Sequence, residues 1–322
     1  MRLFLGIDGG GTKTAFVLLD ESGRVRARQV GGSAYHPEVG VAAVRALLAD
    51  GIQDMLQQAG VGPEAISFAF FGIPCYGEDS RLLPVLDALP HGLLPEGRWR
   101  CGNDVVCGWA GALAGAEGIN VVAGTGSIAY GEWRGRQARS GGWGELFSDE
   151  GSAYWIAREG LAAFSRMSDG RLPRSLLYDR IRAQLQLAAD LDLCAVIYGD
   201  ARGARSAIAR LAPLISDCAH AGDSIASEVL AAAGRELAAL VRAVHAQLEV
   251  DAESAVPVSW SGSLFEVPPL LAGFRDSLGT LPHWDLRAPR LPPDAGAALQ
   301  AARLHGTPLS EAAVAALGTS AP

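Results

Sequence analysis

The sequence predicts an α/β protein built from two related domains. Short β-type runs at residues 3–7 and 15–20 flank a glycine-rich turn, and the same arrangement recurs at residues 119–123 and 128–133. Between such runs lie segments whose apolar residues recur at helical spacing. Two β-turn-β units, each opening one half of a 322-residue chain, therefore indicate two domains on one plan.

The elements of the first half follow from turns and periodicity. After the first hairpin, a turn at residues 21–24 leads to a third strand at 25–30. Apolar positions at helical spacing then predict a helix over residues 41–59 that ends at Gly60. The other expected elements are strands at 66–72 and 99–101 and helices at 80–89 and 105–114.

The second half becomes helical after Glu150. A strand at 137–140 completes its opening hairpins, and alanine- and leucine-rich sequence then predicts helix to about residue 247. Weak breaks are expected at Gly170, Pro173 and Gly203. The last expected elements are a strand at 257–261, helices at 267–278 and 295–304, and a fraying tail from Gly306.

Composition and charge exclude several classes of protein. The chain carries 27 Lys and Arg against 35 Asp and Glu, a formal charge of −8, which argues against nucleic acid as a partner. Apolar residues make up 49%, enough for a packed core, yet no apolar stretch approaches the roughly 18 residues of a membrane helix. We expect a soluble protein without a membrane partner.

Cysteine usage and the N-terminal residues indicate the compartment. The five cysteines are odd in number and lack CxxC spacing, which fits neither a disulfide framework nor a zinc site. Asp8 interrupts the first apolar run before a signal-peptide core could form. We therefore expect a cytoplasmic protein.

The first candidate site is the segment GIDGGGTKT at residues 6–14. It differs from a P-loop because Thr12 stands where the lysine is required, and because a β-type run follows instead of a helix. The favoured interpretation is a hairpin turn whose N–H groups and Thr12 hydroxyl wrap a nucleotide phosphate, while Asp8 faces a hydrated metal ion. The plain alternative is an ordinary glycine-rich hairpin.

A second turn of this kind lies in VVAGTGS at residues 121–127. A dinucleotide fingerprint would open a helix, whereas a strand-like segment follows here. We expect a second phosphate hairpin that faces the first and grips the same triphosphate.

These two turns resemble the phosphate loops of the sugar kinase/actin/heat-shock ATPase superfamily. The segment GGWGELFSDEGSAYWIA at residues 141–157 is similar to the N-acetylglucosamine kinase branch of the BadF/BadG/BcrA/BcrD ATPase family. The resemblance implies two actin-like (ribonuclease H-like) domains with mixed β-sheets flanked by helices and an inter-domain cleft. The first would span residues 1–116, completed by a C-terminal helix at 292–310, and the second residues 117–290, with a helical insertion at about 160–250.

The resemblance also implies ATP and Mg²⁺ as cofactors and roles for individual residues. Asp8 would hold the Mg²⁺ through water, and Asp104 would be the catalytic base and would contact the sugar. The nucleotide would contact Gly10, Gly11, Thr12, Lys13, Thr125, Gly126, Gly262 and Ser263. The sugar would contact His36, Ser127, Ile128, Gly142, Trp143, Gly144 and Asp149.

The chemistry agrees with these roles. Phosphoryl transfer to an alcohol needs a carboxylate to accept the proton, a metal ion to screen the phosphates, and donors positioned in advance. Asp104 could also simply cap the helix over residues 105–114. Trp143 either stacks on a sugar ring or fills the core. Asp149 and Glu150 are adjacent and so poorly suited to glycosidase chemistry; we expect Asp149 to bind sugar and Glu150 to cap the following helix.

The expected reaction is ATP-dependent phosphorylation of N-acetyl-D-glucosamine to its 6-phosphate, by a protein that the resemblance implies is a homodimer. Tyr35 stands where such kinases commonly carry Asn, which leaves glucosamine as an alternative acceptor. A further alternative is an ATPase activator of an iron–sulfur dehydratase or reductase, with Cys101 and Cys107 as candidate ligands, although both positions favour core packing. A non-catalytic sugar sensor is not expected, because the chain opens directly on the phosphate turn.

Overall fold

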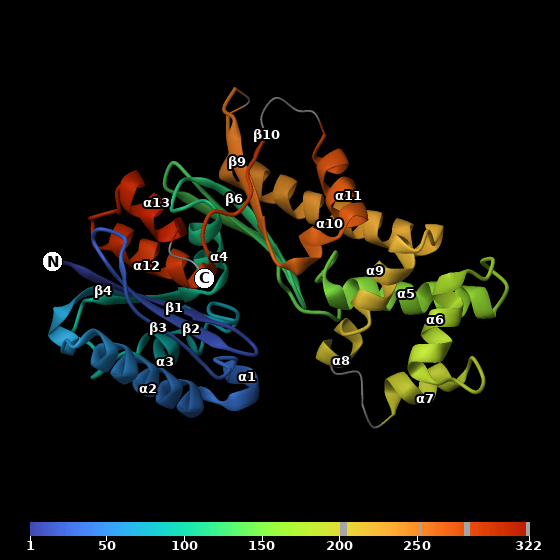
Figure 1. Cartoon of the computed structure of the whole chain (residues 1–322), viewed down its shortest axis with the longest axis horizontal. Coiled ribbons are helices and arrows are strands. Elements are labelled where there is room, and N and C mark those ends of the chain that lie inside the picture. The colour runs from blue at the N-terminus through green and yellow to red at the C-terminus, as the bar shows by residue number, and fades with distance from the viewer. Residues whose placement is uncertain (200–204, 252, 280–283, 320–322) are drawn as a thin grey trace. The chain divides into compact units, whose positions relative to one another are not determined.

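The computed structural model describes residues 1–199, 205–251, 253–279 and 284–319. The chain divides into two compact units, Met1–Gly118 together with Arg287–Pro322, and Ile119–Leu286. Figure 1 follows the chain through these elements in colour. None of the helices in the described part of the chain combines the length and apolar character that a membrane-spanning helix needs.

The first unit contains a five-stranded mixed sheet in the order β3-β2-β1-β4-β5. Its hairpins join β1 (Leu3–Gly9), β2 (Thr14–Asp20) and β3 (Val25–Gly31), which run antiparallel. Parallel to β1 lie β4 (Ile66–Ile73) and then β5 (Trp99–Asn103). A strand thus follows the first glycine-rich turn, and the predicted hairpin is confirmed.

The second unit repeats this strand order as β10-β9-β6-β7-β8. Here β6 (Gly118–Ala123), β7 (Ser127–Trp133) and β8 (Arg136–Gly141) take the places of the three hairpin strands. The parallel strands are β9 (Val256–Ser261) and β10 (Trp284–Leu286). Two mixed sheets of one plan confirm the predicted α/β fold class.

Helices cover both faces of the first sheet, as Figure 1 shows for α2 (Val41–Ala59) and α12 (Pro293–Leu304). Side chains alternate between the faces of a strand. Accordingly, Phe16 and Leu18 pack in the cluster that contains α2, while Val17 and Leu19 pack in the cluster that contains α12. The C-terminal helix therefore completes the core of the first unit.

The helical part of the second unit is divided more finely than the sequence predicts. Its longest helix, α10 (Ser224–Leu248), packs against α11 (Pro268–Leu278) and against β7 and β8. The remaining helices of this unit are α5 (Ala153–Ser168), α6 (Leu176–Leu185), α7 (Asp192–Tyr198), α8 (Arg205–Ala209), α9 (Ala212–His220) and the 3-10 helix η2 (Ser263–Glu266).

Several other elements differ from the prediction. The helix expected at 80–89 is reduced to α3 (Leu83–Asp87), because residues 80–82 form turns. The tail is folded through residue 319 instead of fraying, since Val314 and Leu317 of α13 (Glu311–Thr319) are buried against α12. The sequence did not predict β10, α1 (His36–Val39) or the 3-10 helix η1 (Pro63–Ala65). The helix expected at 105–114 is present as α4 (Val105–Ala112).

Asp223 fixes the start of α10. Its Oδ1 accepts hydrogen bonds from the N–H groups of Ile225 and Ala226, both at 2.9 Å, and its Oδ2 accepts one from Leu177 N–H at 2.8 Å. Burial would raise the pKa of Asp223, but these bonds and one from the Ser175 hydroxyl hold it below its usual value. The carboxylate thus joins α10 to α6.

We predict that Asp223→Ala lowers the free energy of unfolding by about 1–2 kcal/mol, because the first turn of α10 loses its cap. A carboxyl whose pKa is depressed in the folded state stabilises the protein at neutral pH and loses that effect as the pH falls through the folded pKa. The difference from wild type in chemical denaturation should therefore shrink under acidic conditions, and a pH-independent difference would contradict this account.

Candidate active site

The carboxyl ends of three parallel strands bring Asp8 and Asp104 together in the first unit. Asp8 lies opposite Gly72 of β4, which lies opposite Gly102 of β5, and Asp104 follows β5 directly. A Cβ on Gly72 would clash with Cys107 Sγ and would lie 3.2 Å from the Asp104 Cα. The missing side chain at Gly72 therefore lets the start of α4 approach the end of β1.

Asp8 lies where its negative charge is disfavoured. Burial raises the pKa of its carboxyl well above the usual value, and Asp104 and Asp294 raise it further, while the Cys107 thiol and Lys13 oppose them. A cation would relieve this repulsion, and Mg²⁺ is usually held by one or two carboxylates with water and substrate phosphates. The residues present thus fit a hydrated Mg²⁺, although the described residues contain no ready-made cluster of three or more ligands.

The start of α4 shows how Asp104 is placed. Asp104 occupies the N-cap position but its side chain makes no capping hydrogen bond. The Val105 N–H instead donates to Asn103 Oδ1 at 3.1 Å. Asn103, not Asp104, therefore satisfies this end of the helix, and the interpretation of Asp104 as a simple cap is wrong.

His36 belongs to a loop that is tied to the first glycine-rich turn. The Ala34 N–H donates to the Gly10 carbonyl at 3.1 Å, and α1 then begins at His36. The His36 side chain is buried, and its Nε2 has no hydrogen-bond partner among the described residues. Because an unsatisfied buried nitrogen is costly, a ligand group is a suitable partner for it.

In the second unit, the turn after β6 and the turn at Gly262–Ser263 reach one cavity. Thr125, from the turn between β6 and β7, and Ser263, at the start of η2, both line a cavity of about 610 Å³. The Ala153 N–H donates to the Gly124 carbonyl at 2.9 Å, which joins the turn to the start of α5. Thr125 and Ser263 are 138 residues apart in the chain.

The far wall of this cavity comes from helices that carry no recognisable motif. Ser206, Arg210, Ser216 and Asp217 line it together with apolar side chains of α5, α8, α9 and α10. Sequence analysis missed these four polar residues, because they lie within the alanine- and leucine-rich region without diagnostic spacing. The cavity therefore combines a polar turn with a mixed wall, as ligand pockets commonly do.

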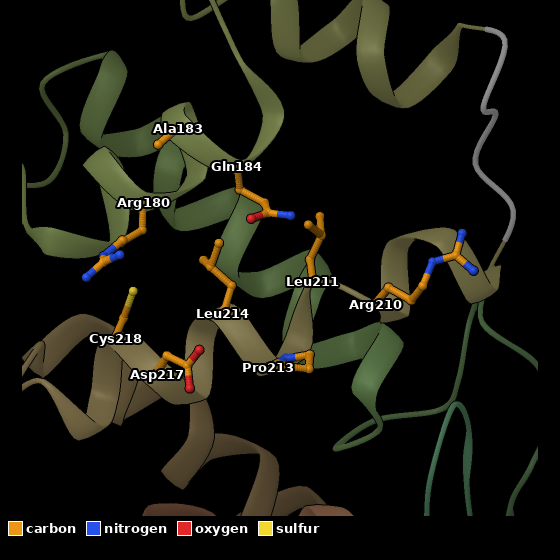
Figure 2. Close-up of a pocket in the computed structure, with 9 residues that line it drawn as sticks. All are labelled: Arg180, Ala183, Gln184, Arg210, Leu211, Pro213, Leu214, Asp217 and Cys218. Atoms are coloured by element: carbon orange, nitrogen blue, oxygen red, sulfur yellow. The ribbon is translucent and has the colours of Figure 1, made fainter.

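A second cavity of about 660 Å³ lies between α6 and α9 (Figure 2) and shares Arg210, Pro213 and Asp217 with the first. The beginning of α9 is thus a common wall of both cavities. Figure 2 shows the side chains of Arg180 and Arg210 pointing in different directions, so their charges do not converge on one anion.

Four of the expected sugar contacts gather beside the second turn. The buried Ser127 donates from Oγ to the Glu150 carbonyl at 2.7 Å, and its N–H donates to Asp149 Oδ1 at 3.4 Å. A Cβ on Gly142 would lie 2.7 Å from Ile128 Cδ1, so this glycine packs directly over the start of β7.

Arg205 is the charged partner of Asp149, and sequence analysis missed it. Its Nη2 donates to Asp149 Oδ2 at 2.6 Å, and its Nε lies 3.6 Å from Glu145 Oε2. The pKa of Asp149 is raised overall, because burial, together with the charges of Glu145 and Glu150, outweighs the lowering by Arg205 and the Ser127 N–H. A lone arginine in a helical region gives no sequence signal for this pairing.

The structure corrects the expected helix cap at Glu150 and decides against one of the two interpretations of Trp143. Glu150 does not cap α5; Ser152 Oγ accepts the hydrogen bond from the Trp155 N–H at 3.2 Å. Trp143 is 70% exposed and so does not fill the core. The Arg139 guanidinium lies 5.8 Å from its ring centroid, within the range of a cation–π contact.

The cysteines proposed for an iron–sulfur cluster are buried. Cys101 Sγ donates to the Leu86 carbonyl at 3.5 Å, and Cys107 Sγ lies 3.7 Å from the Ile7 carbonyl as a donor. Burial and nearby carboxylates raise the pKa of Cys101 to about 12 and that of Cys107 well above its usual value. Both thiols thus favour the protonated form and pack among buried side chains, which agrees with the core packing that their positions predict.

The repeated mixed sheets, each with a glycine-rich turn after its first strand, define an actin-like two-domain ATPase. The chain belongs to the BadF/BadG/BcrA/BcrD ATPase family, whose model matches residues 5–301.

Proteins with sequences similar to that of this chain include sugar kinases. The chain is 28% identical over 313 residues to the N-acetyl-D-glucosamine kinase of Dictyostelium discoideum, covering 93% of this chain and 98% of the relative. It is 30% identical over 280 residues to the N-acetylmuramic acid/N-acetylglucosamine kinase of Clostridium acetobutylicum, covering 86% and 90%. Among solved structures, a candidate N-acetylglucosamine kinase from Chromobacterium violaceum matches with a TM-score of 0.73 and 26% identity, over 94% and 99% of the chains.

Gly262 shapes the turn before Ser263. Its φ of +106° lies in the region that favours glycine, and a Cβ there would clash with the Ala123 carbonyl oxygen. Gly222 offers a matched control, because its φ is +90° and a Cβ would meet nothing within 4 Å.

We predict that Gly262→Ala lowers the unfolding midpoint more than Gly222→Ala. Both changes introduce backbone strain of about 1–3 kcal/mol, but only the first adds a clash with main chain. Thermal unfolding of the two variants measures the difference, and equal midpoints would contradict the packing described at Ala123.

Proposed function

We propose that this protein is an ATP-dependent hexosamine kinase that transfers the γ-phosphoryl group to the 6-hydroxyl of N-acetyl-D-glucosamine. The observation that carries the proposal is local to the second unit. There, Thr125 and Ser263 share a cavity, and the same turn continues into Ser127, which contacts Asp149. A phosphate-binding turn and a carboxylate suited to sugar hydroxyls thus adjoin. Family membership and the kinase relatives support the same reaction.

The nucleotide would be held by main-chain donors on two turns. In the proposal, Gly10, Gly11, Thr12 and Lys13 bind phosphates from the first unit, and Thr125 and Gly126 bind them from the second. Exposed backbone N–H groups in such turns favour anions. Gly262 and Ser263 would lie against the adenosine, with the mixed wall of the cavity around the base.

Asp104 is proposed as the general base. Its carboxylate accepts the proton of the 6-hydroxyl, whose oxygen forms the bond to the γ-phosphorus as the bond to the departing ADP oxygen breaks. Asp8 would hold Mg²⁺ through water, and the ion when bound would neutralise phosphate charge. The geometry of the strand ends, which places Asp8 and Asp104 on either side of Gly72, supports this division of roles.

Sugar recognition would involve polar and aromatic groups from both units. His36 offers a buried Nε2 that lacks a protein partner in the described structure, and Asp149 offers a carboxylate beside Ser127. Trp143 is exposed and presents an aromatic face of the kind that stacks on sugar rings. Its neighbours Gly142 and Gly144 carry no side chain. Tyr35 leaves glucosamine as the second candidate acceptor.

We predict that Asp104→Asn lowers kcat about a thousandfold with little change in stability, because the amide cannot accept the hydroxyl proton. Asp54→Asn, at an exposed position on α2, is the matched control and should retain full activity. A coupled ADP-release assay with ATP, Mg²⁺ and N-acetylglucosamine measures both. Near-wild-type turnover by Asp104→Asn would refute its role as the base.

A panel of acceptors tests the substrate. With glucose, glucosamine, N-acetylglucosamine, N-acetylmannosamine and N-acetylmuramic acid, we expect the highest kcat/KM for N-acetylglucosamine and slow ATP hydrolysis without sugar, because closure around the acceptor excludes water. A higher value for glucosamine would select the alternative acceptor. Rapid sugar-independent hydrolysis would count against a kinase.

We further propose that the protein works in the cytoplasm as a homodimer. Cytoplasmic ATP and the buried, protonated thiols of Cys101 and Cys107 agree with a reducing compartment. Exposed Leu191 and Tyr198, at the two ends of α7, offer apolar surface for a second copy. Light scattering after gel filtration measures the mass in solution, and a monomer at all concentrations would refute the dimer.

A further inference from the structure

We propose that Arg205 is a positioning residue for the sugar acceptor, whose guanidinium pairs with the Asp149 carboxylate and fixes it against the Gly126–Ser127 turn. The inference rests on the proposed function, because it assumes that Asp149 binds the sugar. It adds a residue from the helical region that no motif of the chain identifies.

The geometry places the carboxylate between a cation and the main chain. Arg205, the first residue of α8, donates from Nη2 to Asp149 Oδ2 at 2.6 Å, while Asp149 Oδ1 accepts from the Ser127 N–H at 3.4 Å. A Cβ on Gly126 would lie 3.0 Å from both carboxylate oxygens and would overlap Arg205 Nη2. The absence of a side chain at Gly126 therefore makes room for the ion pair.

Burial makes the partner of Asp149 important. The Asp149 side chain is 2% exposed, whereas that of Arg205 is 34% exposed and reaches in from the surface. The charged groups that act on Asp149 are Glu145 and Glu150 from its own loop and Arg205 from α8; Ser127 of β7 faces it as a neutral donor. Without the guanidinium, three carboxylates would adjoin and the most buried one would favour its protonated form.

A protonated Asp149 would recognise a sugar less well. A carboxylate accepts hydrogen bonds from two hydroxyl groups at once, and such charge-assisted bonds are stronger than neutral ones. Asp149 also has a φ of +61°, which is uncommon for a residue with a side chain, so its direction depends on the contacts that hold it. Arg205 therefore contributes both charge and orientation.

A direct contact of Arg205 with nucleotide phosphate is the competing role. The structure favours the positioning role because the short contact of the guanidinium is with a buried carboxylate: Nη2 lies 2.6 Å from Asp149 Oδ2. The buried Nε lies 3.6 Å from Glu145 Oε2 and has no hydrogen-bond partner among the described residues. The two roles differ in which Michaelis constant they control.

The test compares Arg205→Gln and Arg205→Lys with Arg235→Gln. Arg235 is a matched control, because its Nη2 also lies 2.6 Å from a carboxylate, that of Glu228, on the exposed surface of α10. For each variant, kcat and the KM values for N-acetylglucosamine and ATP are measured from pH 6 to pH 9, with thermal unfolding as a check on folding.

For Arg205→Gln we expect the sugar KM to rise about tenfold, with the KM for ATP and kcat nearly unchanged. The rise should be larger at pH 6 than at pH 9, because loss of the cation raises the pH at which Asp149 becomes protonated. Arg205→Lys keeps the charge without the guanidinium fork and should show a smaller rise and the wild-type pH profile. Arg235→Gln should match wild type.

An unchanged sugar KM and pH profile in folded Arg205→Gln would overturn the inference, and so would a rise confined to the KM for ATP. If Arg205→Gln does not fold, Arg205→Lys decides between the same outcomes: a sugar KM effect supports positioning, and no effect or an ATP-specific effect overturns it. Failure of the wild-type protein to phosphorylate any amino sugar would instead refute the proposed function.

Discussion

Close approach of main chain to main chain, at positions without a side chain, is the constraint on which both units depend. In the first unit, a Cβ on Gly6 would lie 2.5 Å from the Asp294 carbonyl oxygen, and one on Gly111 would lie 2.6 Å from that of Pro292. In the second, Gly234 of α10 faces Gly273 of α11 in the same way. Helices can then lie directly on strands and on each other, at interior packing density.

The carboxylates of the candidate site occupy two different electrostatic environments. Asp8 shares its surroundings with Asp104 and Asp294, so burial and like charge both oppose its ionisation. Asp149 is also buried and its pKa is also raised, but here the Arg205 guanidinium opposes the effect of burial from within the protein. An added cation would stabilise the charged form of Asp8, whereas Asp149 already has a cation beside it in Arg205. This difference agrees with a metal role for Asp8 and with hydroxyl recognition by Asp149.

Elements that depend on local interactions were predictable from the sequence, whereas elements that depend on contacts between distant residues were not. Hairpins were predictable because glycine turns and flanking β-type runs are local signals, and α10 was visible as helical composition. Short β10 was not, because its three residues are strand only through parallel pairing with β9. The cap of α5 was assigned to Glu150 rather than Ser152, an offset of two residues that only backbone geometry decides. The pairing of Arg205 with Asp149 was not predictable either, because the two residues meet only through tertiary contact.

The return of the chain end to the first unit bears on how the protein folds during synthesis. Until α12 leaves the ribosome, Val17 and Leu19 on one face of the first sheet lack the helix that covers them. The intervening unit, Ile119–Leu286, takes roughly 10–30 s to translate at common rates. The first unit therefore stays incomplete throughout the synthesis of the second, and its sheet is fully covered only once α12 has been made.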